Sequence, residues 1–146
     1  MSPADTYPTL IANAIRRPDE PGHFMVLKDL PYRATAHALG VCIADDPAPI
    51  RLQEAGRDLY DPVVYFDRNR VDMGRLSLSD KITHCPLKGT TEYYHLTVGS
   101  DTRQNAAWRY VTPLDFDDRL GRLTDRIAFD SRLVQVVEHT TEDGRR

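Results

Sequence analysis

The chain has 146 residues, the length of one domain, and it can bury a hydrophobic core without disulfides or structural metals. Hydrophobic residues make up 40% and charged residues 28%, as is ordinary for a globular protein. The net charge of -3 argues against a nucleic-acid partner, and the lack of any run of roughly 20 apolar residues argues against a membrane partner.

The two cysteines, Cys42 and Cys85, are fewer than the disulfide framework of a small secreted protein normally has. Residues 1–17 also lack the early positive charge and the continuous apolar run of a signal peptide. We therefore expect a soluble cytoplasmic protein with two free thiols.

The first predicted element is a short helix. Its apolar residues follow the helical spacing i, i+3, i+4, i+7 and i+8, and they are Tyr7, Leu10, Ile11, Ala14 and Ile15. A segment with two prolines and a glycine follows and ends the helix. Residues 1–22 are therefore predicted to be an N-terminal helical extension.

From residue 23 the hydrophobic period changes from helical to two. Ala34, Ala36 and Ala38 alternate with polar residues, and Gly40 then allows a tight turn before a return strand. An Ala-rich helix over 33–39 is the alternative, but the alternation and the flanking proline and glycine favour strands. Strands are expected at residues 23–28, 32–39, 41–44, 50–53, 62–66, 93–98, 105–111, 127–129 and 133–137, and residues 71–76 are ambiguous.

Short strands with turn signals roughly every 8–12 residues are typical of small antiparallel β domains. We expect a mostly β fold, an antiparallel barrel or sandwich-like domain that spans residues 23–139. One short C-terminal helix is predicted at 115–122, and residues 140–146 form a polar tail.

Residues 79–89 are denser in reactive side chains than the rest of the chain, and we expect them to form a loop between two strands. Cys85 is a candidate nucleophile, because cations stabilise a thiolate and both Lys88 and His84 are close in sequence. Alternatively, Cys85 is a small buried thiol that packs as an apolar residue. In an extended segment His84 and Cys85 point to opposite faces, so they converge only if the chain kinks at Pro86.

Aromatic residues on neighbouring predicted strands are candidate walls of a ligand pocket. Because Tyr93 and Tyr94 are adjacent in a strand, they point to opposite faces and at most one of them shares a pocket with Cys85. Packing in the core explains the aromatic residues equally well. The predicted ligand-binding residues are Ser79, Asp80, Thr83, Tyr93, Tyr94, Asn105 and Trp108.

The sequence predicts neither a metal nor a cofactor. Neither cysteine belongs to a paired motif such as CxxC, and the five histidines show no HExxH or HxH pattern. The run Asp115-Phe116-Asp117-Asp118 contains an Asp-x-Asp. It begins a predicted helix, however, where acidic residues stabilise the N-terminus.

The order and spacing of several motifs resemble a known family. The matching residues are Ser79-Asp80, Thr83-His84-Cys85-Pro86, Lys88-Gly89, Tyr93-Tyr94 and Asn105-Ala106-Ala107-Trp108. They are similar to the uncharacterised bacterial and fungal family known as domain of unknown function 427. In this chain Leu87 stands where that family usually has an aromatic residue. The resemblance implies a compact, mostly β domain and no established activity.

Three functions remain open at this point. The first is binding of a small molecule in a pocket formed by the 79–89 loop, Tyr93 or Tyr94, and Trp108. The second is a thiol-dependent enzyme that uses Cys85. The third is a protein-interaction module without a site, whose sheet edges pair in a homodimer or with another partner. We rank small-molecule binding first.

Overall fold

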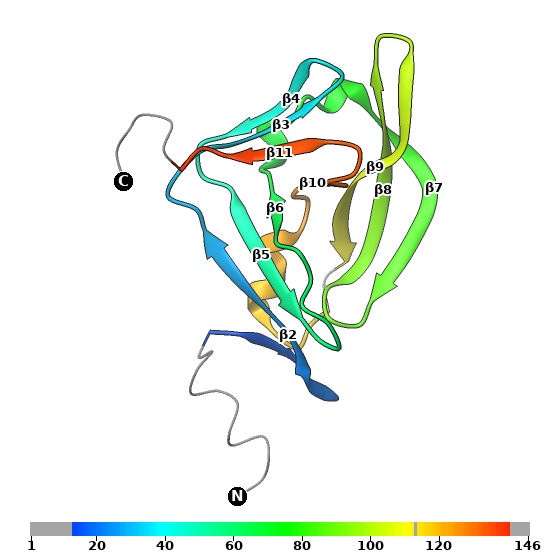
Figure 1. Ribbon diagram of the computed structural model, residues 1–146. Coiled ribbons are helices and arrows are strands. Elements are labelled where there is room, and N and C mark those ends of the chain that lie inside the picture. The colour runs from blue at the N-terminus through cyan, green and yellow to red at the C-terminus, as the bar shows by residue number, and fades with distance from the viewer. Residues whose placement is uncertain (1–12, 113, 141–146) are drawn as a thin grey trace, which may run out of the picture.

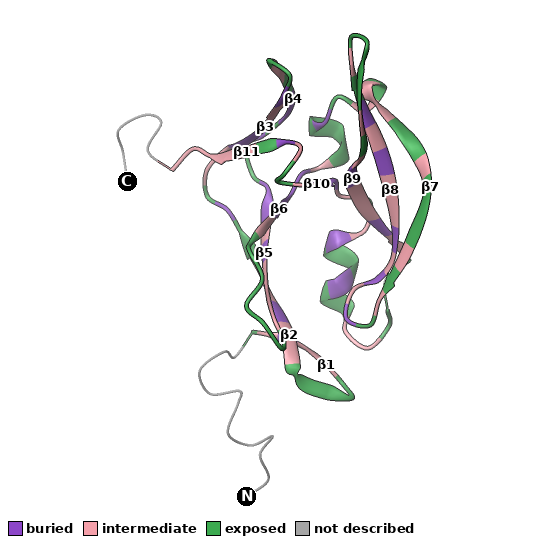
Figure 2. Cartoon of the chain, turned by 45° about the vertical axis from the view of Figure 1, so that its right-hand side comes forward, coloured by how far each residue is buried: buried purple, intermediate pink, exposed green. Residues whose placement is uncertain are grey.

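The computed structural model describes residues 13–112 and 114–140, which fold mostly into antiparallel β-sheet (Figure 1). The predicted fold class is confirmed, because the domain is mostly β and sandwich-like. Two four-stranded sheets face each other, and a three-stranded sheet lies at one end of them (Figures 1 and 2). None of the helices in the described residues is long and apolar enough to cross a membrane.

The first sheet has the order β1-β2-β5-β6, and its strands are β1 (Ile15–Arg17), β2 (Glu20–Asp29), β5 (Ile50–Ala55) and β6 (Val63–Tyr65). Most of the predicted N-terminal helix lies outside the described residues. Its last part is wrong, because Ile15 belongs to a strand that pairs with Met25 of β2. Pairing with β2 buries Ile15 in the core, and this gain outweighs the local helical spacing.

The three-stranded sheet has the order β11-β3-β4, and its strands are β11 (Gln135–Glu138), β3 (Ala34–Ala38) and β4 (Val41–Asp46). The alanines of β3 are buried, as their alternation predicts, so the alternative of a helix is wrong. Leu39 and Gly40 connect β3 to β4 with φ of 52° and 77°. Two successive positive φ values match the twist of a tight β-hairpin.

The second four-stranded sheet has the order β10-β9-β8-β7, and its strands are β7 (Leu76–Cys85), β8 (Gly89–Val98), β9 (Asp101–Thr112) and β10 (Ala128–Phe129). The prediction of a loop over 79–89 is wrong for most of its length, since β7 continues to Cys85. The sequence conceals this strand because β7 is an edge strand with polar side chains on both faces. Its register also shifts between Leu78 and Ile82, which indicates a bulge.

Within residues 13–112 and 114–140, three short 3-10 helices connect the strands: η2 (Arg68–Arg70), η3 (Met73–Arg75) and η4 (Asp118–Leu123). The predicted C-terminal helix is therefore present as η4, which lies between the two four-stranded sheets (Figure 2). Asp117 caps η4, because its carboxylate accepts a hydrogen bond of 2.9 Å from the backbone N–H of Arg119. The Asp-x-Asp motif therefore serves the start of this helix, as predicted.

Two hydrophobic clusters form the core. The first lies between the three-stranded sheet and the β7–β10 sheet, and the second lies between the two four-stranded sheets and includes the leucines of η4. Phe66 and Ile127 exchange backbone hydrogen bonds of 2.8 and 2.9 Å, which connect the chain after β6 to the chain before β10. This connection fixes the two sheets relative to each other beside the candidate site.

Candidate functional site

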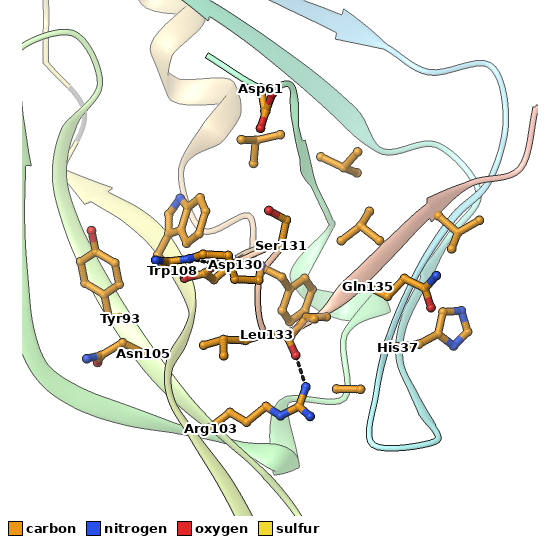
Figure 3. Close-up of a pocket in the computed structure, with 18 of the residues that line it drawn as sticks. His37, Asp61, Tyr93, Arg103, Asn105, Trp108, Asp130, Ser131, Leu133 and Gln135 are labelled. Carbon is orange, nitrogen blue, oxygen red and sulfur yellow. Dashed lines mark hydrogen bonds and ion pairs between the residues drawn. The ribbon is translucent and has the colours of Figure 1, made fainter.

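A cleft of about 1500 Å³ opens between the β8–β9 hairpin and the segment that leads from β10 into β11 (Figure 3). Tyr93, Asn105 and Trp108 lie on one side of it, and His37 and Gln135 lie on the other. The three residues on the first side all belong to the predicted ligand-binding set. The structure therefore brings together residues that are 12 to 15 positions apart in the sequence, since β8 and β9 pair in this region.

Tyr93 and Trp108 form an aromatic wall of the cleft. They are direct partners on β8 and β9, and their ring centroids are 6.4 Å apart. The indole Nε1 of Trp108 donates a hydrogen bond of 3.2 Å to the hydroxyl of Tyr65, which fixes the orientation of the indole. Both rings are only partly buried, so part of their surface faces the cleft.

Side chains of β7 support this wall. The hydroxyls of Thr83 and Tyr93 are 3.0 Å apart, and Ser79 donates a hydrogen bond of 2.5 Å to the amide oxygen of Asn105. The ammonium of Lys81 lies 4.4 Å from the centroid of the Tyr93 ring, within the range of a cation–π contact. Lys81 also lines the cleft. Ser79 and Thr83 do not line it, but they form hydrogen bonds with Asn105 and Tyr93, which do.

Asn105 has a backbone conformation that is unusual for a residue other than glycine, with φ of 53°. It lies where the register of β8 and β9 shifts, and its backbone N–H donates a hydrogen bond of 3.1 Å to Nδ1 of His95. Its amide oxygen is occupied by Ser79, but its amide N–H groups have no acceptor among the described residues. Asn105 therefore presents two unused donors at the cleft.

The cleft also contains a carboxylate that is already neutralised, that of Asp130 beside Trp108 (Figure 3). Asp130 accepts hydrogen bonds from the backbone and the guanidinium of Arg132, at 2.7 to 3.0 Å. The Arg132 guanidinium holds the pKa of the Asp130 carboxyl below its usual range. Nearby, Arg103 donates a hydrogen bond to the carbonyl of Leu133 (Figure 3).

A buried polar cluster lies behind the aromatic wall. The carboxylate of Glu54 is 2.5 Å from the ammonium of Lys88 and 2.7 Å from Nε2 of His23. Burial raises the pKa of Glu54, but Lys88 and His23 outweigh it, and the result is a pKa below the ordinary value. Burial lowers the pKa of Lys88, but Tyr110 and Glu54 outweigh it, and the result is a raised pKa.

Tyr110 connects this cluster to the cleft. Its ring centroid lies 5.5 Å from the Lys88 ammonium and 6.1 Å from the ring centroid of Tyr65, and Tyr110 also lines the cleft. Burial raises the pKa of Tyr110, although Lys88 opposes this shift. Burial likewise raises the pKa of Tyr65 well above its ordinary value.

The three predicted catalytic residues do not face the cleft. Lys88 is paired with Glu54, and Cys85 is half-buried against the second hydrophobic cluster. His84 is exposed, and its Nδ1 is 2.9 Å from the hydroxyl of Thr90. This places His84 and Cys85 on opposite faces of β7, as expected for neighbours in a strand. A catalytic role for them stays a prediction.

Besides Ser79 and Thr83, two more members of the predicted ligand-binding set do not line the cleft. Asp80 is exposed in the bulge of β7, and Tyr94 is buried in the first hydrophobic cluster. Leu87, where the resemblance expects an aromatic residue, is fully buried in the second cluster. Leu87 therefore fills the core.

Sequence reasoning missed several residues that line the cleft. Lys81 lies within the segment that the sequence singled out, but no motif distinguishes it from the other lysines. Arg103, Asp130 and Arg132 carry no motif either. Asp130 reaches the cleft because its backbone N–H bonds to the carbonyl of Ala106, at 2.8 Å, after β10 has paired with β9. The pairing of β9 with β10 joins distant segments, and no local pattern in the sequence predicts that it carries Asp130 to the cleft.

The fold and the site define a mostly β, sandwich-like domain. Its cleft has an aromatic wall and lies between the β8–β9 hairpin and the segment that leads from β10 into β11. The chain belongs to the family described as Domain of unknown function (DUF427), whose sequence pattern matches residues 27–140. The resemblance seen in the sequence is therefore confirmed. No curated protein matches the chain.

Proposed function

We propose that this protein binds a small planar molecule in the cleft, with a ring of the ligand against Tyr93 and Trp108. The observation that carries the proposal is the pair of partly open rings, 6.4 Å apart, on the wall of a cleft of about 1500 Å³. Small-molecule sites are typically concave, with aromatic walls and a few polar groups that orient the ligand.

The contacts around the rings support a preformed site. Trp108 is held by its hydrogen bond to Tyr65, and Tyr93 is held between Thr83 and Lys81. A wall that is already ordered binds a ligand without the entropic cost of ordering its side chains. The same contacts favour binding over thiol chemistry, because Cys85 packs into the core and does not line this cleft.

The test uses fluorescence, because Trp108 is the only tryptophan of the chain. A panel of small aromatic compounds is screened for quenching of Trp108 emission and for a rise in melting temperature. We expect at least one compound to do both. Tyr93→Ala should then weaken its binding about tenfold, because a lost aromatic pair costs on the order of 1 kcal/mol in addition to the buried area.

Tyr60→Ala is the matched control, because Tyr60 is an exposed tyrosine outside the cleft. Tyr60→Ala should leave the dissociation constant unchanged, and Trp108 fluorescence can still be used to measure it. The proposal is wrong if no compound of the panel affects either signal. It is also wrong if Tyr93→Ala and Tyr60→Ala give the same dissociation constant as the wild type.

A further inference from the structure

We infer that the ligand carries an anionic group, which Lys81 and the amide of Asn105 bind beside the ring of Tyr93. This inference rests on the proposed function and specifies its ligand as an aromatic anion, such as an aromatic carboxylate, sulfonate or phosphate. Two observations support it. Hydrogen-bond donors of Lys81 and Asn105 at the cleft are unused among the described residues, and carboxylates near them are already paired with arginines.

The ammonium of Lys81 lies at the aromatic wall of the cleft and is available to bind a ligand. No carboxylate lies within 4.0 Å of its Nζ among the described residues, and its one close contact is the face of the Tyr93 ring. Lys88, in contrast, is buried and bonded to Glu54. The three N–H donors of Lys81 can therefore bind an anion whose ring lies on the same wall.

The amide of Asn105 supplies further donors to the same cleft. The Ser79 hydroxyl accepts a hydrogen bond of 3.1 Å from the backbone N–H of Lys81 and donates one of 2.5 Å to the amide oxygen of Asn105. The backbone of Lys81 and the amide of Asn105 therefore share Ser79 as a hydrogen-bond partner, and both residues line the cleft. With its oxygen engaged, the Asn105 amide offers only N–H groups, so this corner of the cleft favours an acceptor with negative charge.

Among the described residues, three acidic side chains line the cleft: Asp61 lies away from Asn105 (Figure 3), and the other two are already paired. Asp130 is near enough to Lys81 for an electrostatic interaction, but its carboxylate is bonded to Arg132. Glu138, also at the cleft, forms an ion pair with Arg51 at 3.0 Å. Lys81 thus retains a positive charge that the protein has not neutralised.

Two dyes that differ in one anionic group test the inference. 8-Anilinonaphthalene-1-sulfonate and N-phenyl-1-naphthylamine share their rings, but only the first has a sulfonate. Dissociation constants of both are measured by dye fluorescence and by quenching of Trp108. The variants are Lys81→Gln, Asn105→Gly, which keeps the positive φ accessible, and Lys28→Gln, which removes the same charge from an exposed site outside the cleft.

We expect Lys81→Gln to weaken binding of the sulfonate about tenfold or more, as for a lost hydrogen bond to a charged group, and to change binding of the neutral dye less than twofold. Asn105→Gly should act in the same direction, and Lys28→Gln should leave both dyes unchanged. Added salt should weaken binding of the sulfonate alone. Melting temperatures confirm that each variant is folded.

The outcomes separate the two proposals. If both dyes quench Trp108 but Lys81→Gln has the same effect on the sulfonate as Lys28→Gln, the anionic group is overturned and the aromatic site stands. If neither dye quenches Trp108 but a neutral compound of the aromatic panel does, the inference falls and the aromatic site stands. If no compound of the panel affects Trp108 emission or the melting temperature, both fall.

Discussion

Removing one partner of the buried Glu54–Lys88 pair is expected to destabilise the protein much more than removing both. The side chains of Glu54 and Lys88 are only 13% and 11% exposed, and the pair joins β5 to the turn between β7 and β8. In Lys88→Met the carboxylate of Glu54 keeps its contact with His23 but stays buried without its cation. The variant therefore retains the desolvation cost of the charge and loses the attraction that offsets it.

The magnitude follows from the burial of both groups. Leaving one charge of a buried pair without its partner costs about 3–5 kcal/mol. For a chain of this size, each kcal/mol lowers the melting temperature by roughly 2–4 °C, so Lys88→Met should melt roughly 6–20 °C below the wild type. The double variant Glu54→Gln/Lys88→Met removes both charges, so it should be more stable than Lys88→Met by about 2 kcal/mol or more.

Urea denaturation at neutral pH, followed by circular dichroism and by Trp108 fluorescence, gives the free energy of unfolding of each variant. Lys28→Met is the control, because Lys28 is exposed, and its effect should stay within about 0.5 kcal/mol. A loss below about 1 kcal/mol in Lys88→Met, or a double variant no more stable than Lys88→Met, would refute the reasoning. The buried pair would then contribute little to holding this turn.

Three further predictions concern other parts of the molecule. Because pairing lowers the pKa of Glu54 below its ordinary value near 4.5, the stability it contributes is present above that value and is lost as the pH falls through the lower, folded pKa. Urea midpoints should therefore fall more steeply below pH 5 in the wild type than in Glu54→Gln, and equal slopes would contradict this. Leu39→Asn should stabilise the protein by about 0.5–1 kcal/mol, because Asn before Gly40 suits a hairpin turn with positive φ; a lower melting temperature would argue against a strained Leu39. Cys42, which is exposed, should be alkylated faster than the half-buried Cys85 when both sites are followed by mass spectrometry, and the reverse order would show that Cys85 is accessible.

The sequence predicts the strands well where a local pattern reflects burial on one face. The alanines of β3 alternate because they pack into the core, and Gly40 marks the turn that follows. Prediction from the sequence fails where the structure is decided by a contact between separate segments, or where a strand carries no apolar pattern. Ile15 fits a helical spacing but forms a strand with Met25, and β7 looks like a loop because it is a polar edge strand.

Only the wall of the cleft formed by β8 and β9 could be predicted from the sequence. Tyr93 and Trp108 could be found because a hairpin places consecutive strands side by side. Glu54, the partner of Lys88, lies 34 residues before it and has no motif. Sequence spacing suggested a role for Lys88 beside Cys85, but it could not reveal that Lys88 pairs with Glu54.

Lys81 and Lys88 have different roles. Lys81 lines the cleft itself, whereas Tyr110 lies between Lys88 and the cleft. Lys88 reaches the cleft only through Tyr110, whose ring contacts that of Tyr65, which in turn accepts the hydrogen bond of Trp108. We therefore expect a change at Lys88 to alter the proposed ligand binding indirectly, through the position of the aromatic wall, and to lower stability as well. Lys81 lies over the Tyr93 ring and has no carboxylate within 4.0 Å of its ammonium in the described part of the chain, so its removal should alter recognition and leave stability nearly unchanged. A loss of anion binding in Lys81→Gln at an unchanged melting temperature would thus separate recognition from the integrity of the fold, which no variant of Lys88 can do.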